Sequence, residues 1–204
     1  MRRGRDVNDE VMFRGDLAAV FILLTLIRVY YARKAGEADE KSSADGEGKS
    51  GAVLLRVSNS LAAVATLVYL VAPRWMRWSA LPLPAWLRWI GMAVGLVTIA
   101  LFLWVHRALG ENWSTSVETK EQHALVTSGP YRWVRHPMYT TMFVWTLAFF
   151  LLSANWFVGI TWLALSILAA SRAGREEAAL IETFGAEYQA YVQRTGRFLP
   201  GLGC

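Results

Sequence analysis

Long apolar blocks separated by short polar or Gly/Pro-bearing segments dominate the pattern of this 204-residue chain. Five blocks stand out, at residues 17–31, 52–72, 86–105, 138–152 and 156–170. A helix needs about 20 residues to cross a bilayer, and each of the first three blocks reaches this length once a turn is added at the ends of the first. The last two blocks are shorter and are separated only by Ser153, Ala154 and Asn155, which predicts a tight helical hairpin.

The last part of the chain, residues 172–194, has a charged and amphipathic pattern instead. Apolar and aromatic side chains recur there at helical spacing: Ala178, Leu180, Ile181, Phe184, Tyr188 and Tyr191. This periodicity predicts a helix that lies on the surface rather than one that crosses the membrane. The whole pattern therefore predicts an all-α integral membrane protein with about five transmembrane helices and an amphipathic C-terminal helix, built as a single membrane domain over residues 1–204.

The composition agrees with a membrane protein. Hydrophobic residues make up 54% of the chain and charged residues only 18%, whereas about 25% of the residues in soluble proteins are charged. This excludes a disordered chain and a collagen-like fibre. The one cysteine, Cys204, leaves no intramolecular disulfide to form, so a disulfide-stabilised secreted scaffold is excluded as well.

The basic residues predict a topology. If the loops 32–52 and 107–136 lie on one side with the C-terminal tail, that side holds most of the Lys and Arg residues, and the positive-inside rule makes it cytoplasmic. The net charge of +5 suits membrane lipids with anionic headgroups and gives no reason to invoke nucleic acid. Four tryptophans in and beside the connector before the third block fit an interfacial aromatic belt: Trp75, Trp78, Trp86 and Trp89.

A first candidate site lies just before the fourth block, in residues 129–139 (GPYRWVRHPMY). Pro137 can begin a helix, because the N–H that proline lacks is not needed in the first turn. The free N–H groups and the positive dipole end of that helix would then meet Arg135, His136 and Tyr139 at one place. This arrangement predicts a site for an anion or a carboxylate. The alternative is an interfacial anchor in which these side chains contact only lipid headgroups.

Two further polar features fall on the same side of the membrane. Arg172 and Glu176 are four residues apart and therefore share a helix face, either as part of a site or as a surface ion pair. The loop 121–129 contains His123, which alone proves nothing. No metal site is expected, because the three histidines lack a two-ligand helical spacing. No phosphate-binding loop is present, and a Rossmann-type nucleotide domain is excluded.

Taken together, these features resemble the isoprenylcysteine carboxyl methyltransferase family. The shared pattern runs through His123-Ala-Leu-Val, Gly129-Pro-Tyr131, Arg135-His136-Pro137-Met-Tyr139 and, after the hairpin, Arg172 with Glu176-Glu177. The resemblance covers roughly residues 100–200, and the chain's size is similar to that of compact prokaryotic members. It implies a membrane methyltransferase that uses S-adenosyl-L-methionine and releases S-adenosyl-L-homocysteine.

The resemblance also implies site residues and a division of the chain. Three spans would lie in residues 1–106, and the catalytic half, with the cofactor-binding loop, the hairpin and the C-terminal helix, in 107–204. Glu176 and Arg172 would be catalytic, with Arg172 binding the carboxylate of the substrate. Family contacts to the cofactor fall on His123, Ala124, Leu125, Val126, Tyr131, His136, Pro137, Met138, Tyr139 and Glu176. The chain departs from the family at one further cofactor position, where Ser116 replaces an amide side chain.

The resemblance implies that a prenylcysteine-like acceptor enters from the bilayer while the cofactor enters from the cytoplasm. One alternative is a phospholipid or other small-molecule amine methyltransferase, in which Glu177 would accept the proton of the amine. Arg172 argues against this alternative, because a cation beside an ammonium acceptor is unfavourable. A second alternative is a non-catalytic membrane relative that kept the motifs and lost turnover.

Overall fold

The computed structural model describes residues 2–34, 49–109 and 125–201, and in these ranges the chain is helical apart from short connections. The elements in chain order are α1 (Arg2–Lys34), α3 (Lys49–Val71), η1 (Pro73–Ser79), α4 (Ala85–Leu109), η3 (Gly129–Arg132), α5 (Pro137–Ser153), α6 (Trp156–Ala170) and α7 (Ala173–Arg194). Among the described residues, β-type pairing is limited to two isolated bridges. The all-α fold class is therefore confirmed.

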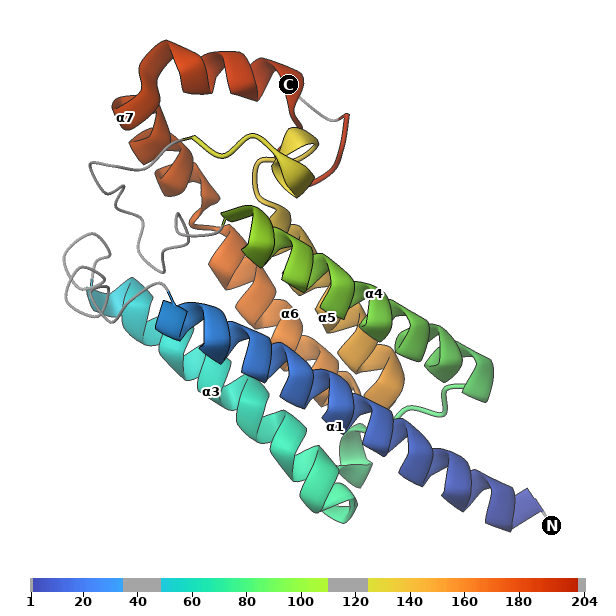
Figure 1. The fold of residues 1–204 in the computed structure, drawn as a ribbon. Helices are drawn as coiled ribbons and strands as arrows, with labels where there is room; N and C mark the ends of the chain where they lie inside the picture. Colours follow the sequence, from blue (N-terminus) through green and yellow to red (C-terminus); the bar gives the residue numbers. More distant parts are fainter. Residues whose placement is uncertain (1, 35–48, 110–124, 202–204) are drawn as a thin grey trace.

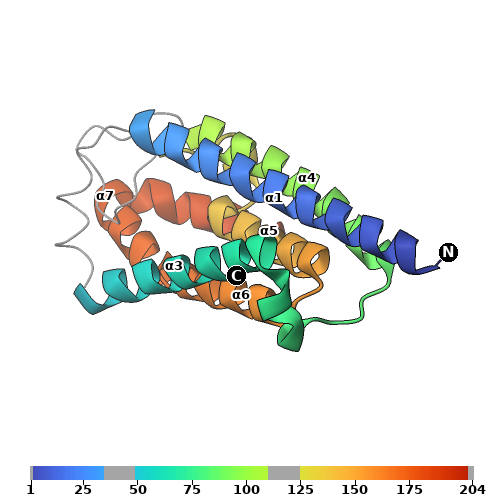
Figure 2. The ribbon, with the colours of Figure 1, turned by 90° about the horizontal axis from the view of Figure 1, so that it is seen from below.

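Five long helices, α1, α3, α4, α5 and α6, form one bundle, and α7 bends back over one end of it together with η3 (Figure 1). Figure 2 shows the same bundle turned by 90°, with α1 beside α4 and α3 beside α6. In the described part of the chain, three stretches are long and apolar enough to cross a membrane: Gly51–Val71, Ala85–Leu109 and Trp156–Arg194. The protein is an integral membrane protein, whereas the count of five spans stays a prediction.

The apolar part of the third stretch is α6. Only Ser171 and Arg172 separate α6 from α7, so the two helices follow one another almost without a break. α7 carries charges along its length and has only three buried residues, as the amphipathic pattern predicted. It is kinked at Gly185, where φ is +51°, a value that glycine adopts without strain.

The first helix is much longer than its apolar block. The sequence pattern predicted a helix that exceeds residues 17–31 by about a turn at each end, but α1 begins at Arg2. Residues 2–16 contain no proline, the residue that disfavours a helix interior most strongly. The extension places Glu10 and Phe13 against the rest of the bundle, with Phe13 only 1% exposed.

The core of the bundle is formed by one face of α1 against α5 and α6. Phe13, Leu17, Val20 and Leu24 recur at spacings of four, three and four residues, so they lie on one side of α1 and are all buried. They pack in one cluster with Phe149, Leu152 and Trp162. α4 approaches α5 so closely that a Cβ added to Gly91 would lie 2.7 Å from the Leu151 Cβ atom.

The predicted hairpin between α5 and α6 is confirmed, and Asn155 stabilises it. Its side-chain oxygen accepts hydrogen bonds from the backbone N–H groups of Phe157 and Val158, both at 3.1 Å, and so caps α6. Its amide nitrogen donates to the Met76 carbonyl oxygen at 3.0 Å. The turn is thereby held against η1, at the end of the bundle away from α7.

A buried arginine fastens four helices at this same end. Arg88 of α4 is 7% exposed; its guanidinium forms an ion pair with Glu10 of α1 and donates to the Leu152 carbonyl oxygen of α5 at 2.7 Å. The hydroxyl of Tyr69, on α3, donates to Glu10 at 3.0 Å. The Phe13 ring lies 4.4 Å below the guanidinium carbon. These contacts satisfy a charge that would otherwise be costly to bury.

Candidate functional site

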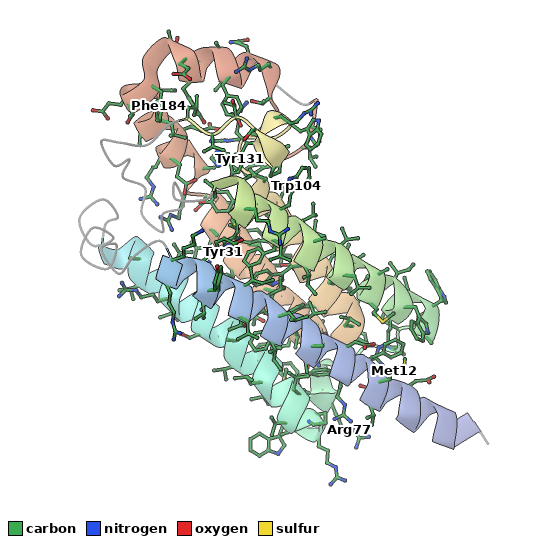
Figure 3. All side chains as sticks on the ribbon, in the orientation of Figure 1. Met12, Tyr31, Arg77, Trp104, Tyr131 and Phe184 are labelled. Atoms are coloured by element: carbon green, nitrogen blue, oxygen red, sulfur yellow. The ribbon has the colours of Figure 1, made fainter. Side chains whose placement is uncertain are left out.

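The candidate site lies at the α7 end of the bundle, where η3 leads into α5. Figure 3 labels Tyr131 and Phe184 at this end, opposite Met12 and Arg77. Pro137 occupies the first turn of α5 and His136 is the residue before the helix, as the sequence predicted. The C-terminal segment holds this loop in place: the backbone N–H of Arg135 donates to the Gly196 carbonyl oxygen at 2.8 Å.

His136 lies between two carboxylates. Its Nδ1 atom is 3.4 Å from Glu176 Oε2, and its Nε2 atom is 3.1 Å from Glu177 Oε1. The ring also stacks on Tyr139, with centroids 5.6 Å apart. An imidazole donates from both nitrogens only when it is protonated, so this environment favours the imidazolium form.

Glu177 is the centre of a second set of contacts. Besides His136, its carboxylate accepts from Arg135 Nε at 3.0 Å and lies 3.0 Å from a terminal nitrogen of Arg197. Arg135 donates further to the Val192 carbonyl oxygen at 3.1 Å. Glu177 therefore connects the start of α5, α7 and the C-terminal segment through one carboxylate.

Glu176 faces a different set of groups. Its carboxylate accepts a hydrogen bond from the Tyr139 hydroxyl and lies near His136 Nδ1, and the charge of Arg172 acts on it. Two oxygens provide about four lone-pair positions, so capacity remains for a further donor. A helix start with an imidazolium suits a carboxylate, and the free capacity of Glu176 suits an ammonium group. Together they fit a ligand that carries both a carboxylate and an ammonium group.

The ionisation of the three groups follows from these contacts. Burial lowers the pKa of His136, but the hydrogen bonds and charges of Glu176 and Glu177 outweigh it and raise that pKa overall. Burial raises the pKa of Glu176, yet contacts with His136 and Tyr139 and the charge of Arg172 bring it below its usual value. Burial also opposes ionisation of Glu177, but His136, Arg135 and Arg197 lower its pKa to about 2.

The lowered pKa of Glu177 predicts how the stability of the fold changes at low pH. Because the folded-state pKa of Glu177 lies below its usual value of 4.5, its ionised contacts stabilise the fold fully above about pH 4.5 and lose this effect as the pH falls towards 2. Glu177→Gln should therefore lower the thermal midpoint in detergent at pH 7, and the difference from wild type should shrink between pH 4.5 and 2. Glu187→Gln, at an exposed position of α7, is the control. An equal difference at pH 3 and pH 7 would contradict the assignment.

The remaining predicted site residues are placed as follows. Arg172 is the half-buried residue before α7, one turn ahead of Glu176, whose backbone N–H donates to the Arg172 carbonyl oxygen at 3.1 Å. Tyr131 lies in η3, its carbonyl oxygen accepts from the Tyr191 hydroxyl at 2.6 Å, and burial raises its pKa. The charge of Glu176 also acts on Tyr131, so the two lie in one neighbourhood.

Four other residues that were predicted to contact the cofactor are buried or half-buried. Pro137 is buried, and Met138 is half-buried against the hydrophobic core. Leu125 and Val126 are half-buried in the segment that leads into η3. His123 and Ala124, and Ser116 with them, lie outside the described residues.

The structure also brings in residues that the sequence did not single out. Arg197 reaches Glu177 from the C-terminal segment, and Tyr191 anchors η3. Tyr188 is 1% exposed beside the same charges. The aromatic periodicity of α7 could have indicated that Tyr188 and Tyr191 face inward. No local pattern indicates a partner for Arg197, because its contact depends on how the chain returns to α5.

Comparisons with known proteins match the part of the chain that contains this candidate site. Residues 89–182 match the model of the isoprenylcysteine carboxyl methyltransferase (ICMT) family. The chain is 37% identical over 95 residues to protein-S-isoprenylcysteine O-methyltransferase of Homo sapiens, covering 45% of this chain and 33% of the human protein. The corresponding protein of Saccharomyces cerevisiae is 37% identical over 98 residues, covering 45% of this chain and 39% of the yeast protein. The matched region thus spans little more than a third of these relatives.

The fold has a solved counterpart as well. The structure of the eukaryotic intramembrane Ras methyltransferase ICMT aligns with a TM-score of 0.58 over 96% of this chain and 68% of that one, at 21% sequence identity. This likeness concerns the fold alone. The family match contains His136, Tyr139, Arg172, Glu176 and Glu177. The resemblance predicted from the motifs is confirmed: residues 89–182 match the isoprenylcysteine carboxyl methyltransferase family.

Proposed function

We propose that this protein is a membrane methyltransferase that transfers the methyl group of S-adenosyl-L-methionine to the carboxylate of a prenylcysteine-like lipidic acceptor, giving a methyl ester. The observation that carries the proposal is the cluster at the start of α5, in which His136 and Tyr139 contact Glu176 with Arg172 alongside, inside the region that matches the family. Residues 107–204 would form the catalytic half and residues 1–106 the three N-terminal spans.

The cofactor would be held mainly at its amino-acid end. Glu176 would accept from the ammonium group, while His136, Tyr139 and the first turn of α5, with Pro137 and Met138, would surround the carboxylate. Tyr131 and the segment His123, Ala124, Leu125 and Val126 would line the adenosine. When bound, S-adenosyl-L-methionine supplies an electrophilic sulfonium methyl group.

The chain's own residues have a limited task in this reaction. A carboxylate has a pKa of about 4 and is ionised at neutral pH, so no general base is needed. Arg172 would bind this carboxylate and orient one oxygen in line with the methyl group. The acceptor's apolar chain would remain in the bilayer, and the buried surroundings would exclude water from the nucleophile. The active site would open to the cytoplasm, on the side that the basic residues predict.

The contacts of Glu177 argue against an amine acceptor. Methylation of an ammonium group requires a base to remove its proton, and Glu177 was the candidate. Its carboxylate is occupied by Arg135, His136 and Arg197, which lower its pKa to about 2. A group with so low a pKa is a poor proton acceptor at neutral pH. The carboxylate acceptor is therefore the function that the geometry supports best.

The test is methyl transfer from radiolabelled S-adenosyl-L-methionine to N-acetyl-S-farnesylcysteine by the purified protein in liposomes. Base-labile label in the product is expected, because methyl esters hydrolyse in base. Saturable cofactor binding without transfer would keep the site and overturn the acceptor. Neither binding nor transfer would contradict the proposal and favour the non-catalytic relative.

A further inference from the structure

The short helix η1 (Pro73–Ser79, sequence PRWMRWS) divides its side chains into three rows. A 3₁₀ helix has three residues per turn, so residues three apart lie one above the other. Met76 and Ser79 form a row that is buried against the bundle, at 6% and 0% exposed. Trp75 and Trp78 form a row that is 75% and 61% exposed, and the third row consists of Arg74 and Arg77.

The tryptophan row marks this end of the bundle as the level of a membrane interface. Indole rings collect where lipid headgroups meet the hydrocarbon core. Trp86 and Trp89 of α4 are also exposed, at 61% and 47%, and join this belt. The candidate methyl-transfer site lies at the other end of α5, a 17-residue helix of about 25 Å. The two regions therefore lie at opposite ends of the bundle.

The arginine row lines a cavity of about 470 Å³. The lining also includes Asp9, Glu10 and Phe13 from the N-terminal half of α1 and Arg88 from the first turn of α4. The lining contains apolar side chains together with five charged ones: Asp9, Glu10, Arg74, Arg77 and Arg88. Such a surface suits a ligand that has a charged part and an apolar part.

Not all of the charged side chains that line the cavity are available to bind a ligand. Arg88 and Glu10 form an ion pair with each other. Within the described part of the chain, no carboxylate is in ion-pair contact with Arg74 or Arg77, and no cation with Asp9. Two guanidinium groups and one carboxylate therefore remain to meet a ligand. Guanidinium groups bind phosphate oxygens through paired N–H donors, and a carboxylate binds an ammonium group.

We propose that this cavity binds the headgroup of phosphatidylethanolamine. The phosphodiester meets Arg74 and Arg77, the ammonium group meets Asp9, and the acyl chains lie along the half-buried Leu81 and Leu83 of the lining and down the outside of the bundle. Exposed apolar side chains such as Val71, which is 83% exposed, provide that outer surface. The site is independent of the methyl-transfer function, because it lies at the opposite end of the protein and uses none of the same residues.

The experiment is native mass spectrometry of the detergent-purified chain titrated with phosphatidylethanolamine or phosphatidylglycerol of equal chain length. Wild type should retain one phosphatidylethanolamine at least fivefold more tightly than phosphatidylglycerol. Arg74→Ala combined with Arg77→Ala should remove this binding, whereas Arg56→Ala, at an exposed position of α3 outside the cavity, should not. Asp9→Asn should abolish the preference between the two lipids. Soluble glycerophosphoethanolamine should not compete, because it lacks the acyl chains.

Each opposite result has a clear meaning. Unchanged retention by the double arginine variant would overturn the site, and equal binding of both lipids by wild type would overturn the headgroup. Competition by glycerophosphoethanolamine would mean that a free headgroup, not a lipid, is the ligand. Methyl transfer in mixed micelles should be the same for wild type and the double variant, so a failure of the proposed methyl transfer is distinguished from a failure of the lipid site.

Discussion

Replacing Glu176 with glutamine is expected to lower kcat/KM for S-adenosyl-L-methionine about 100-fold or more. The carboxylate is three-quarters buried and already accepts from Tyr139 beside His136. An amide of the same shape carries no charge for the cofactor's ammonium group, and it leaves the imidazolium of His136 with one carboxylate instead of two. The loss should appear chiefly as weaker cofactor binding.

The measurement is the dissociation constant for S-adenosyl-L-methionine by calorimetry, together with initial rates at saturating acceptor. Glu182→Gln is the matched control, because Glu182 lies on the same helix but is exposed. A cofactor affinity of Glu176→Gln equal to that of wild type, in a protein that unfolds at the same temperature, would remove Glu176 from the site.

Replacing Arg172 with alanine is expected to lower kcat/KM for the acceptor about 100-fold, with a much smaller change in cofactor affinity. The proposed role of Arg172 is a charge-assisted hydrogen bond to the acceptor carboxylate, which also orients the nucleophile. Because Arg172 acts on Glu176 as well, removal of its charge should have some effect on the cofactor. Arg172→Lys should restore part of the rate, since an ammonium group keeps the charge but not the paired geometry.

The check is a comparison of acceptor KM and cofactor dissociation constant in the same preparations. Arg175→Ala removes an exposed arginine one turn further along α7 and serves as the control. If Arg172→Ala reduced cofactor affinity as strongly as acceptor kinetics, Arg172 would belong to the cofactor site. A wild-type rate would exclude it from both.

Much of the helical structure could be predicted from the hydrophobic pattern. The five apolar blocks lie within α1, α3, α4, α5 and α6 or exceed them by a residue, because spacing and length of apolar runs report directly on membrane helices. Pro137 marked the start of α5 through local chemistry. The length of α1 could not be predicted in this way. Its first half is polar, and its position depends on the contacts of Glu10 and Phe13 with Arg88.

The candidate site was predicted in its residue types but not in its connections. His136, Tyr139 and Glu176 were named from their resemblance to a known pattern, and the structure brings them together across 37 to 40 residues of chain. Glu177 was considered only as a base. Its contacts with Arg135 and Arg197 give it a different part, that of holding α5, α7 and the C-terminal segment together.

The sequence by itself determined which segments are apolar enough to enter a membrane and that a helix begins at Pro137, and it predicted which side chains carry chemistry. The tertiary structure alone decided which charges meet: Glu10 with Arg88, and His136 with both Glu176 and Glu177. The reason is physical. Periodicity along a helix fixes the face on which a residue lies, whereas the partner of a buried charge depends on how separate helices pack, and that packing is set by contacts far apart in the chain.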